Sequence, residues 1–245
     1  MTKKTPKKIR LDRLLSNLGY GGRKEMAMAI KNEWVSIEGN IITNPSYQVD
    51  MSIVRAGGVK IDDEPLDPLS PLIIMLHKPV GYTCSLKDPG DIIYDLLPER
   101  FRGRKPVLSS VGRLDKYSSG QLLLTDDGDL LHRLIHPKKQ VKKYYHVQLE
   151  GDLRGNEAEL FARGDFLLKG DEKPLKPAEW ISEDERTGVM ILSEGRYHQI
   201  RRMFEMLGNK VVALHRYKTG SLEMKNLGEG EWRIISEEER QKLFA

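Results

Sequence analysis

The stretch VGRLDKYSSGQLLLTDDGD, residues 111–129, decides how the middle of this chain folds. It predicts a tight loop between Gly112 and Gly120, then a strand over residues 121–125, then the start of a helix. The strand contains three consecutive leucines, and a short apolar run of this kind is typical of a buried strand. The loop before it carries two charged residues, Arg113 and Asp115. The sequence therefore places a cation and a carboxylate beside a buried strand.

This charged pair has two possible meanings. A carboxylate next to a buried strand costs free energy unless a cation pairs with it, and Arg113 is the predicted partner of Asp115. Cationic neighbours also keep an aspartate ionised, because they lower an aspartate pKa by roughly one to three units. An ionised aspartate can act as a nucleophile or a base. The residues alone leave open an ordinary loop ion pair and a catalytic aspartate.

Length and composition limit the class of protein. A chain of 245 residues can form one large domain, or a large domain with a small one. No apolar run approaches the length that spans a membrane, and the lysine-rich N-terminus has no apolar segment behind it. Cys84 is the only cysteine, and the six histidines show no HExxH or similar spacing. We expect a cytoplasmic protein without a disulfide, a cysteine-rich zinc site or a metal.

Positive charge is concentrated at the start of the chain. Residues 1–62 hold eleven Lys or Arg against six Asp or Glu, whereas the remainder holds 29 against 30. A basic module attached to a nearly neutral body is typical of a device that docks onto a polyanion. The sequence therefore predicts an RNA, DNA or anionic lipid partner, and charge alone does not choose among them.

The first quarter of the chain shows a basic tail and a small α/β pattern. The tail, residues 1–8, has four lysines and nothing to bury. Two helices are predicted, one from Ile9 to Gly19 and one over residues 22–33. A hairpin follows over residues 35–42, with Gly39 and Asn40 as its turn, and then a strand pair over residues 52–61. We expect residues 9–62 to form one module.

Beyond this module the sequence predicts a linker and a larger domain. Residues 63–71 hold prolines and acidic residues without an apolar period, which favours a stiff extended linker. In the larger domain, residues 72–245, strands are predicted over 72–76, 144–149 and 189–192, and helices over 156–162 and 197–207. Gly208 is the expected end of the last helix. The pattern favours an α+β fold with a mixed, mostly antiparallel sheet.

Four motifs together resemble a known enzyme family. They are HKPVGYTCS (residues 77–85), GRLD with the following TDDG (residues 112–128), KPLKPA (residues 173–178) and SEGRYHQIRRMFEMLGNKVVALHR (residues 193–216). In this order they resemble the pseudouridine synthases of ribosomal RNA in the RsuA family. Residues 9–40 resemble the S4 RNA-binding domain, except that family members usually have glycine where Glu33 stands. The resemblance thus implies an S4-like module followed by a pseudouridine synthase catalytic domain.

The resemblance implies a reaction and a partner. The expected reaction isomerises a specific uridine of 16S ribosomal RNA to pseudouridine, with the target base flipped out and with no cofactor. The expected partner is ribosomal RNA within a small-subunit assembly intermediate, and the expected oligomeric state is a monomer. Two alternatives remain: the same reaction on large-subunit RNA, and an S4-type assembly factor that binds RNA without chemistry.

The resemblance also implies roles for individual residues. Asp115 matches the essential aspartate, and Arg113 matches the residue that fills the gap left by the flipped base. Two tyrosines in one strand face opposite ways, and the family pattern places Tyr145 in the pocket and Tyr144 outside it. Arg201 matches the basic residue that pairs with the aspartate, whereas we interpret His198 as structural or RNA-contacting. Further RNA contacts are expected from cationic residues: Lys78, Arg10, Arg13, Arg23, Lys24, Lys138, Lys139, Lys142, Lys143 and Arg202.

Overall fold

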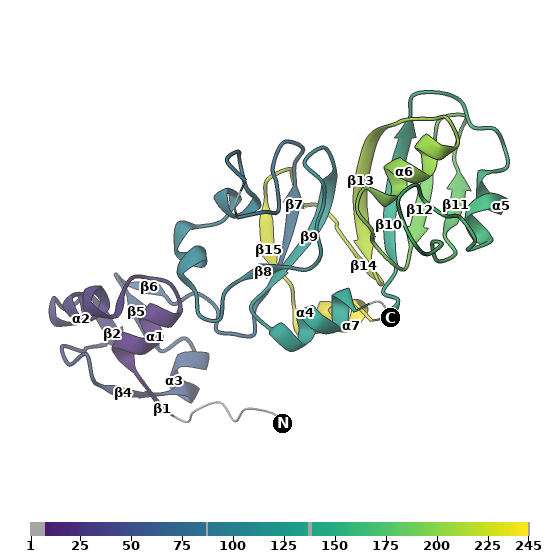
Figure 1. Ribbon diagram of the computed structural model, residues 1–245. Helices are drawn as coiled ribbons and strands as arrows, with labels where there is room; N and C mark the ends of the chain where they lie inside the picture. The colour runs from purple at the N-terminus through teal and green to yellow at the C-terminus, as the bar shows by residue number, and fades with distance from the viewer. Residues whose placement is uncertain (1–7, 87, 137–138, 245) are drawn as a thin grey trace. The chain divides into compact units, whose positions relative to one another are not determined.

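The computed structural model describes residues 8–86, 88–136 and 139–244 (Figure 1). The chain divides into two compact units, one of residues 1–72 and 97–108 and one of residues 73–96 and 109–245. Over the described residues, no helix combines the length and the apolar character needed to cross a membrane.

The first unit packs three helices and two small sheets around one core. Its helices are α1 (Leu11–Asn17), α2 (Arg23–Lys31) and α3 (Met51–Arg55). A two-stranded sheet pairs β1 (Lys8–Arg10) with β4 (Gln48–Asp50), and a second sheet has the order β3 (Asn40–Ile41), β2 (Val35–Ile37), β5 (Val59–Ile61), β6 (Glu64–Pro65). The core holds the four leucines at helical spacing, Leu11, Leu14, Leu15 and Leu18.

Three local predictions for this unit were wrong in detail. The first helix begins at Leu11, because residues 8–10 belong to β1. The predicted strand pair over residues 52–61 is helix α3 followed by β5, and the Asp50 side chain caps that helix by accepting from the Ser52 backbone N–H at 2.8 Å. The hairpin turn is Glu38 and Gly39, which both have positive φ, rather than Gly39 and Asn40.

The segment predicted as a stiff interdomain linker, residues 63–71, is part of the first unit. Strand β6 adds to its sheet, and Leu66 and Leu69 pack against its core. The Asp67 carboxylate accepts a hydrogen bond from Arg100 at 2.9 Å, which ties the segment to residues 97–108. The prolines hide this packing from a search for apolar periodicity. The predicted boundary at residue 72 also leaves out residues 97–108, which belong to the first unit.

The second unit is built on a nine-stranded sheet. Its main order is β11 (Glu179–Ser182), β12 (Thr187–Leu192), β10 (Lys143–Leu149), β13 (Val211–Thr219), β9 (Ser119–Thr125), β7 (Ile73–Lys78), β15 (Trp232–Ile234). Two short strands, β8 (Ser109–Ser110) and β14 (Leu222–Glu223), pair with β9 and β13. Every pairing is antiparallel except that of β9 with β13, so the predicted mixed, mostly antiparallel sheet is confirmed.

The parallel pairing of β9 with β13 joins the two halves of this sheet. It consists of two residue pairs, His215 with Ser119 and Arg216 with Gly120. A Cβ atom on Gly120 would lie 2.1 Å from the carbonyl oxygen of Arg216, and Gly120 has φ +109°. Only glycine therefore allows this close approach. The GRLD loop directly precedes the junction.

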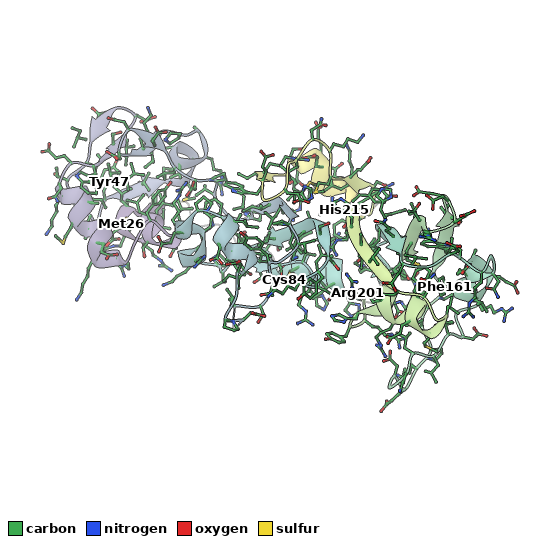
Figure 2. The ribbon with its side chains drawn as sticks, turned by 90° about the horizontal axis from the view of Figure 1, so that it is seen from above. Met26, Tyr47, Cys84, Phe161, Arg201 and His215 are labelled. Carbon is green, nitrogen blue, oxygen red and sulfur yellow. The ribbon has the colours of Figure 1, made fainter. Side chains whose placement is uncertain are left out.

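Helices cover both halves of the sheet. Helix α4 (Gly128–Ile135) begins where predicted, since the Asp127 side chain accepts from the N–H groups of Asp129 and Leu130. It packs near α7 (Glu237–Lys242), and an ion pair at 2.9 Å joins Asp127 to Arg240. Helices α5 (Glu157–Ala162) and α6 (Gln199–Met206) cover the other half, where the rings of Phe161 and Phe204 lie 5.3 Å apart (Phe161 is labelled in Figure 2). Two short 3-10 helices, Ile93–Leu96 and Glu99–Gly103, complete the chain.

Candidate active site

Asp115 lies in a small cavity that several distant segments build. The cavity has a volume of about 80 Å³ and is lined by Arg113 and Asp115 of the GRLD loop, Tyr145 of β10 and His198 before α6. These segments meet because β9 pairs with β13 and β13 pairs with β10. The structure thus brings together Asp115, Arg113 and Tyr145, which the sequence places in separate motifs.

A buried leucine fixes the loop that carries Asp115. Leu114 is buried between Arg113 and Asp115, and its backbone N–H and carbonyl lie 3.5 and 3.4 Å from the Cys84 Sγ atom. Burial raises the pKa of the Cys84 thiol, which keeps it neutral in this position. The backbone carbonyl of Asp115 closes the loop by accepting from the Ser118 backbone N–H at 3.0 Å.

The expected ion pair between Arg113 and Asp115 is not formed in the described part of the chain. The Asp115 carboxylate instead faces His198, with Nε2 of His198 3.4 Å from Oδ1. His198 adopts a left-handed backbone conformation, φ 49°, and stacks on the Tyr197 ring with the centroids 3.9 Å apart. This conformation also explains why α6 begins two residues later than predicted. The motif that contains His198 was recognised, but its spacing gave no sign of this contact.

Arg201 supports the Asp115 loop without touching the carboxylate (Arg201 is labelled in Figure 2). Its Nη1 donates to the Val211 carbonyl at 2.9 Å, and its Nη2 donates to the Tyr117 carbonyl at 2.8 Å. The expectation of a direct pair with Asp115 is therefore wrong for this structure. Arg201 therefore holds the backbone at Tyr117, two residues after Asp115.

Arg202 is committed to a structural contact rather than free for phosphate. Its Nη2 donates to the Asp171 carboxylate and to the Lys169 carbonyl, both at 2.7 Å. Arg196 donates to the other oxygen of Asp171 at 2.8 Å. These hydrogen bonds lower the pKa of Asp171, that from Arg202 most strongly. Two arginines and one aspartate thus clamp the segment before KPLKPA against the start of α6, and the RNA role predicted for Arg202 is corrected accordingly.

Lys78 is buried and cannot reach RNA. It is 0% exposed, and its Nζ donates to the carbonyls of Ser118 at 2.7 Å and Pro79 at 2.9 Å. Burial lowers its pKa to about 8. The expected phosphate contact is contradicted, because the side chain of a residue at the end of β7 points into the protein. Lys78 fastens the end of the Asp115 loop instead.

The two neighbouring tyrosines lie in different surroundings. Tyr145 is buried and lines the cavity of Asp115. Tyr144 packs near the Tyr217 ring at 6.1 Å, and the Lys218 ammonium lies 4.5 Å from its ring centre. Strand alternation therefore separates them as expected.

The remaining predicted RNA contacts fall into two groups. Near β10, Lys139 and Lys142 are exposed, Lys143 is partly buried, and Lys138 lies outside the described residues. In the first unit, Arg13 and Lys24 are exposed, whereas Arg10 and Arg23 donate to the buried carboxylate of Asp12. The hydrogen bond from Arg10 is the main cause of the lowered pKa of Asp12. Arg10 and Arg23 therefore also stabilise the fold of their unit.

Known proteins are similar to this chain in sequence and fold. The profile of the family described as RNA pseudouridylate synthase matches residues 72–206. The Ribosomal small subunit pseudouridine synthase A of Haemophilus influenzae is 38% identical over 240 residues, which cover 96% of this chain and 99% of that protein. An uncharacterized RNA pseudouridine synthase of Aquifex aeolicus is 36% identical over 96% of both chains.

A solved structure supports the same assignment. A crystal structure of a pseudouridylate synthase is 37% identical, has a TM-score of 0.67, and is matched over 96% of this chain and 99% of that one. With the family profile and full-length relatives in agreement, the chain belongs to the RNA pseudouridylate synthase family and is an enzyme that forms pseudouridine in RNA.

Proposed function

We propose that this enzyme converts a specific uridine of 16S ribosomal RNA to pseudouridine, with Asp115 as its essential nucleophile or base. The observation that carries the proposal is the shared cavity of Asp115, Arg113 and Tyr145 at the junction of β9 with β13. The choice of small-subunit RNA is supported by relatives named Ribosomal small subunit pseudouridine synthase A that match almost the whole chain.

The reaction needs a carboxylate and a dry, shaped pocket. The bond from uracil N1 to C1′ breaks, the base turns, and C5 forms the new bond to C1′; C5 loses a proton and N1 gains one. Asp115 can assist by attacking C1′, by adding to C6, or by removing the 2′ proton. Carboxylate nucleophiles act at sugar carbons in glycosidases, so the first route has a chemical precedent. A side chain 30% exposed at the cavity suits a group that must reach substrate.

Neighbouring residues would prepare the pocket for a flipped base. Tyr145 lies in the cavity wall, where its ring can stack on uracil and its hydroxyl group can take part in proton transfer. Arg113 is exposed at the mouth, where a planar cation can fill the gap in the RNA stack. Arg201 and Lys78 hold the carbonyls of Tyr117 and Ser118 and so act as positioning residues for the Asp115 loop.

The first unit would dock the enzyme onto folded RNA. It carries the positive excess of the chain, with Arg13 and Lys24 exposed on its helices. An enzyme with a separate basic unit recognises RNA around the target as well as the target base. Base extrusion costs less free energy in loops and unfinished RNA. We therefore infer that a small-subunit assembly intermediate is the preferred substrate.

The deciding experiment maps pseudouridine in both ribosomal RNAs of cells that lack the gene. Complementation with the wild type should restore one site in 16S RNA, and Asp115→Asn should restore none. In vitro, the nearly isosteric Asp115→Asn should lower turnover on the order of 10⁴-fold or more while RNA binding persists. A restored site in large-subunit RNA would refute the substrate, and turnover of Asp115→Asn within tenfold of the wild type would refute the role of Asp115.

The substrate state is tested by rates on three forms of the RNA. Free 16S RNA, an assembly intermediate and finished small subunits should rank with the intermediate fastest. Free RNA lacks the shaped neighbourhood, and the finished subunit closes access. A rate on free RNA equal to that on the intermediate would contradict the need for a protein-shaped substrate.

A further inference from the structure

A second cavity adjoins the one that holds Asp115. Its volume is about 140 Å³, enough for several waters, since a water molecule takes up roughly 30 Å³ in the liquid. It shares Arg113, Tyr145 and Gly195 with the first cavity, so the two meet at these residues. Its charged lining residues are Arg113, Lys143 and Arg216, which are all cationic. Among the described residues, no carboxylate lines it.

Arg216 is the least expected of these cations. It is 4% exposed, and its Nε donates to the Gln121 carbonyl at 2.7 Å across the β9–β13 junction. Within the described part of the chain, no carboxylate pairs with it and its two terminal nitrogens have no hydrogen-bond partner. Guanidinium groups stay charged, and a buried charge without a partner costs much free energy. A buried cation that lines a cavity and lacks an internal counter-ion indicates an external anion.

Lys143 adds a second charge to the same space. It lies in β10 two residues before Tyr145, and its Nζ donates only to the Val141 carbonyl, at 3.1 Å, among the described residues. Its pKa is lowered to about 8, first by burial and then by the positive charges of Arg216 and Lys176. The cavity therefore has a positive potential that the protein itself does not neutralise. Thr219, which pairs with Lys143 in the sheet, adds a hydroxyl group to the lining.

We propose that this cavity binds a backbone phosphate of the RNA, the one joined to the uridine held beside Asp115. The guanidinium fork matches phosphate oxygens in two parallel hydrogen bonds, and RNA offers no other anion. The shared residues Arg113 and Tyr145 place this phosphate next to the base pocket, which sets the register of the strand as it enters. This inference rests on the proposed function of the Asp115 cavity and assigns Arg216 and Lys143 to substrate binding.

Small ligands test the site without any catalytic turnover. The Asp115→Asn protein is titrated by calorimetry with uridine, 5′-UMP and 3′-UMP. One of the two nucleotides should bind about ten- to a hundredfold more tightly than uridine, the gain expected of charge-assisted hydrogen bonds. Arg216→Gln and Lys143→Gln should each remove most of that gain. Equal affinity for uridine and both nucleotides, or a gain that survives both substitutions, would overturn the site.

Lys143→Gln is the variant that keeps the test valid if Arg216→Gln fails to fold, because the hydrogen bond from Arg216 to Gln121 remains. On the target RNA, Lys143→Gln should raise KM and leave kcat nearly unchanged. It should also reduce the slope of log binding constant against log salt concentration by up to about 0.7, which is the value for one phosphate contact to single-stranded RNA. Lys210→Gln is the control for bulk charge, since Lys210 is exposed and pairs with Glu150 at 2.9 Å. It should leave KM and slope unchanged. Equal slopes for Lys143→Gln and Lys210→Gln would refute the phosphate site, whereas absence of pseudouridine with the wild type would refute the proposed function instead.

Discussion

His198 faces Asp115, with its Nε2 3.4 Å from Oδ1, although 82 residues of chain separate the two. The contact is longer than the 2.7–3.2 Å typical of an N–H···O hydrogen bond, and both side chains are about one-third exposed. Asp115 is therefore not locked in a tight ion pair. A carboxylate in this state remains available to a substrate, and Arg201 holds the backbone of the loop rather than the carboxylate.

His198→Gln should reduce kcat by less than about fivefold, since exposed ion pairs contribute roughly 0.2–1 kcal/mol. The glutamine keeps a polar side chain near Asp115. Single-turnover rates on the target RNA, compared with Asp115→Asn, check this. A loss of a hundredfold or more would make His198 a proton-transfer group in the reaction.

Tyr145→Phe should slow turnover with little change in thermal stability, because the ring still stacks while the cavity loses the hydroxyl group. Tyr144→Phe is the matched control, since Tyr144 lies against Tyr217 on the other side of the strand. The measurement is kcat and melting temperature for both variants. A turnover defect confined to Tyr144→Phe would contradict the pocket assignment.

Local patterns in the sequence predicted the elements that build the site. The leucine run gave β9, and the TDDG motif gave the Asp127 cap of α4, because burial and capping depend on residues close in the chain. The prediction of a strand pair over residues 52–61 was wrong because helix α3, which is capped by Asp50, contains too few residues to show a helical period.

The hydrogen-bond partners of the long cationic side chains could not be predicted from the sequence. Lys78 and Arg202 were predicted to contact RNA because lysine and arginine side chains near a site usually face solvent. Their actual partners, the Ser118 carbonyl and Asp171, lie 40 and 31 residues away in the chain. No role for Arg216 could be inferred from the sequence, since an arginine in a strand pattern does not indicate whether its charge is paired.

Gly120→Ala should destabilise the second unit strongly. A Cβ atom there would lie 2.1 Å from the Arg216 carbonyl oxygen, which belongs to the backbone and cannot turn away. Gly112→Ala is the control, since Gly112 also has positive φ, +72°, but nothing within 4 Å of its Cβ position. The control should cost about 1–2 kcal/mol for the left-handed backbone, and Gly120→Ala a further 1–3 kcal/mol for overpacking. Equal melting temperatures for the two variants would show that β9 and β13 can separate without loss.

Arg13→Gln and Arg10→Gln should affect different properties of the first unit. Arg13 is exposed, so its loss should reduce the salt slope of RNA binding by up to about 0.9 and leave stability unchanged. Arg10 holds the buried Asp12, so Arg10→Gln should lower stability at pH 7. The pKa of Asp12 is lowered in the folded state, so its stabilising effect is present above the ordinary pKa of 3.8 and is lost as pH falls through the folded value. Denaturation at pH 7 and at successively lower pH should show a difference between Arg10→Gln and wild type that shrinks in acid.

The pH dependence of RNA affinity should identify Lys143 as a phosphate contact. Its pKa in the free protein is about 8, so kcat/KM should fall as pH rises through 8 and the ammonium loses its charge. Lys143→Arg keeps the charge at all these pH values and should flatten the profile.

The stability of the fold should change in the opposite direction. The pKa of Lys143 in the folded protein lies below the ordinary 10.5, so the unfolded chain binds more protons between pH 8 and 10.5. Stability therefore rises with pH across that window. A loss of affinity at high pH therefore cannot come from unfolding through this lysine. Because Lys78 titrates in the same range, the decisive comparison is between wild type and Lys143→Arg, and identical profiles would remove Lys143 from the binding site.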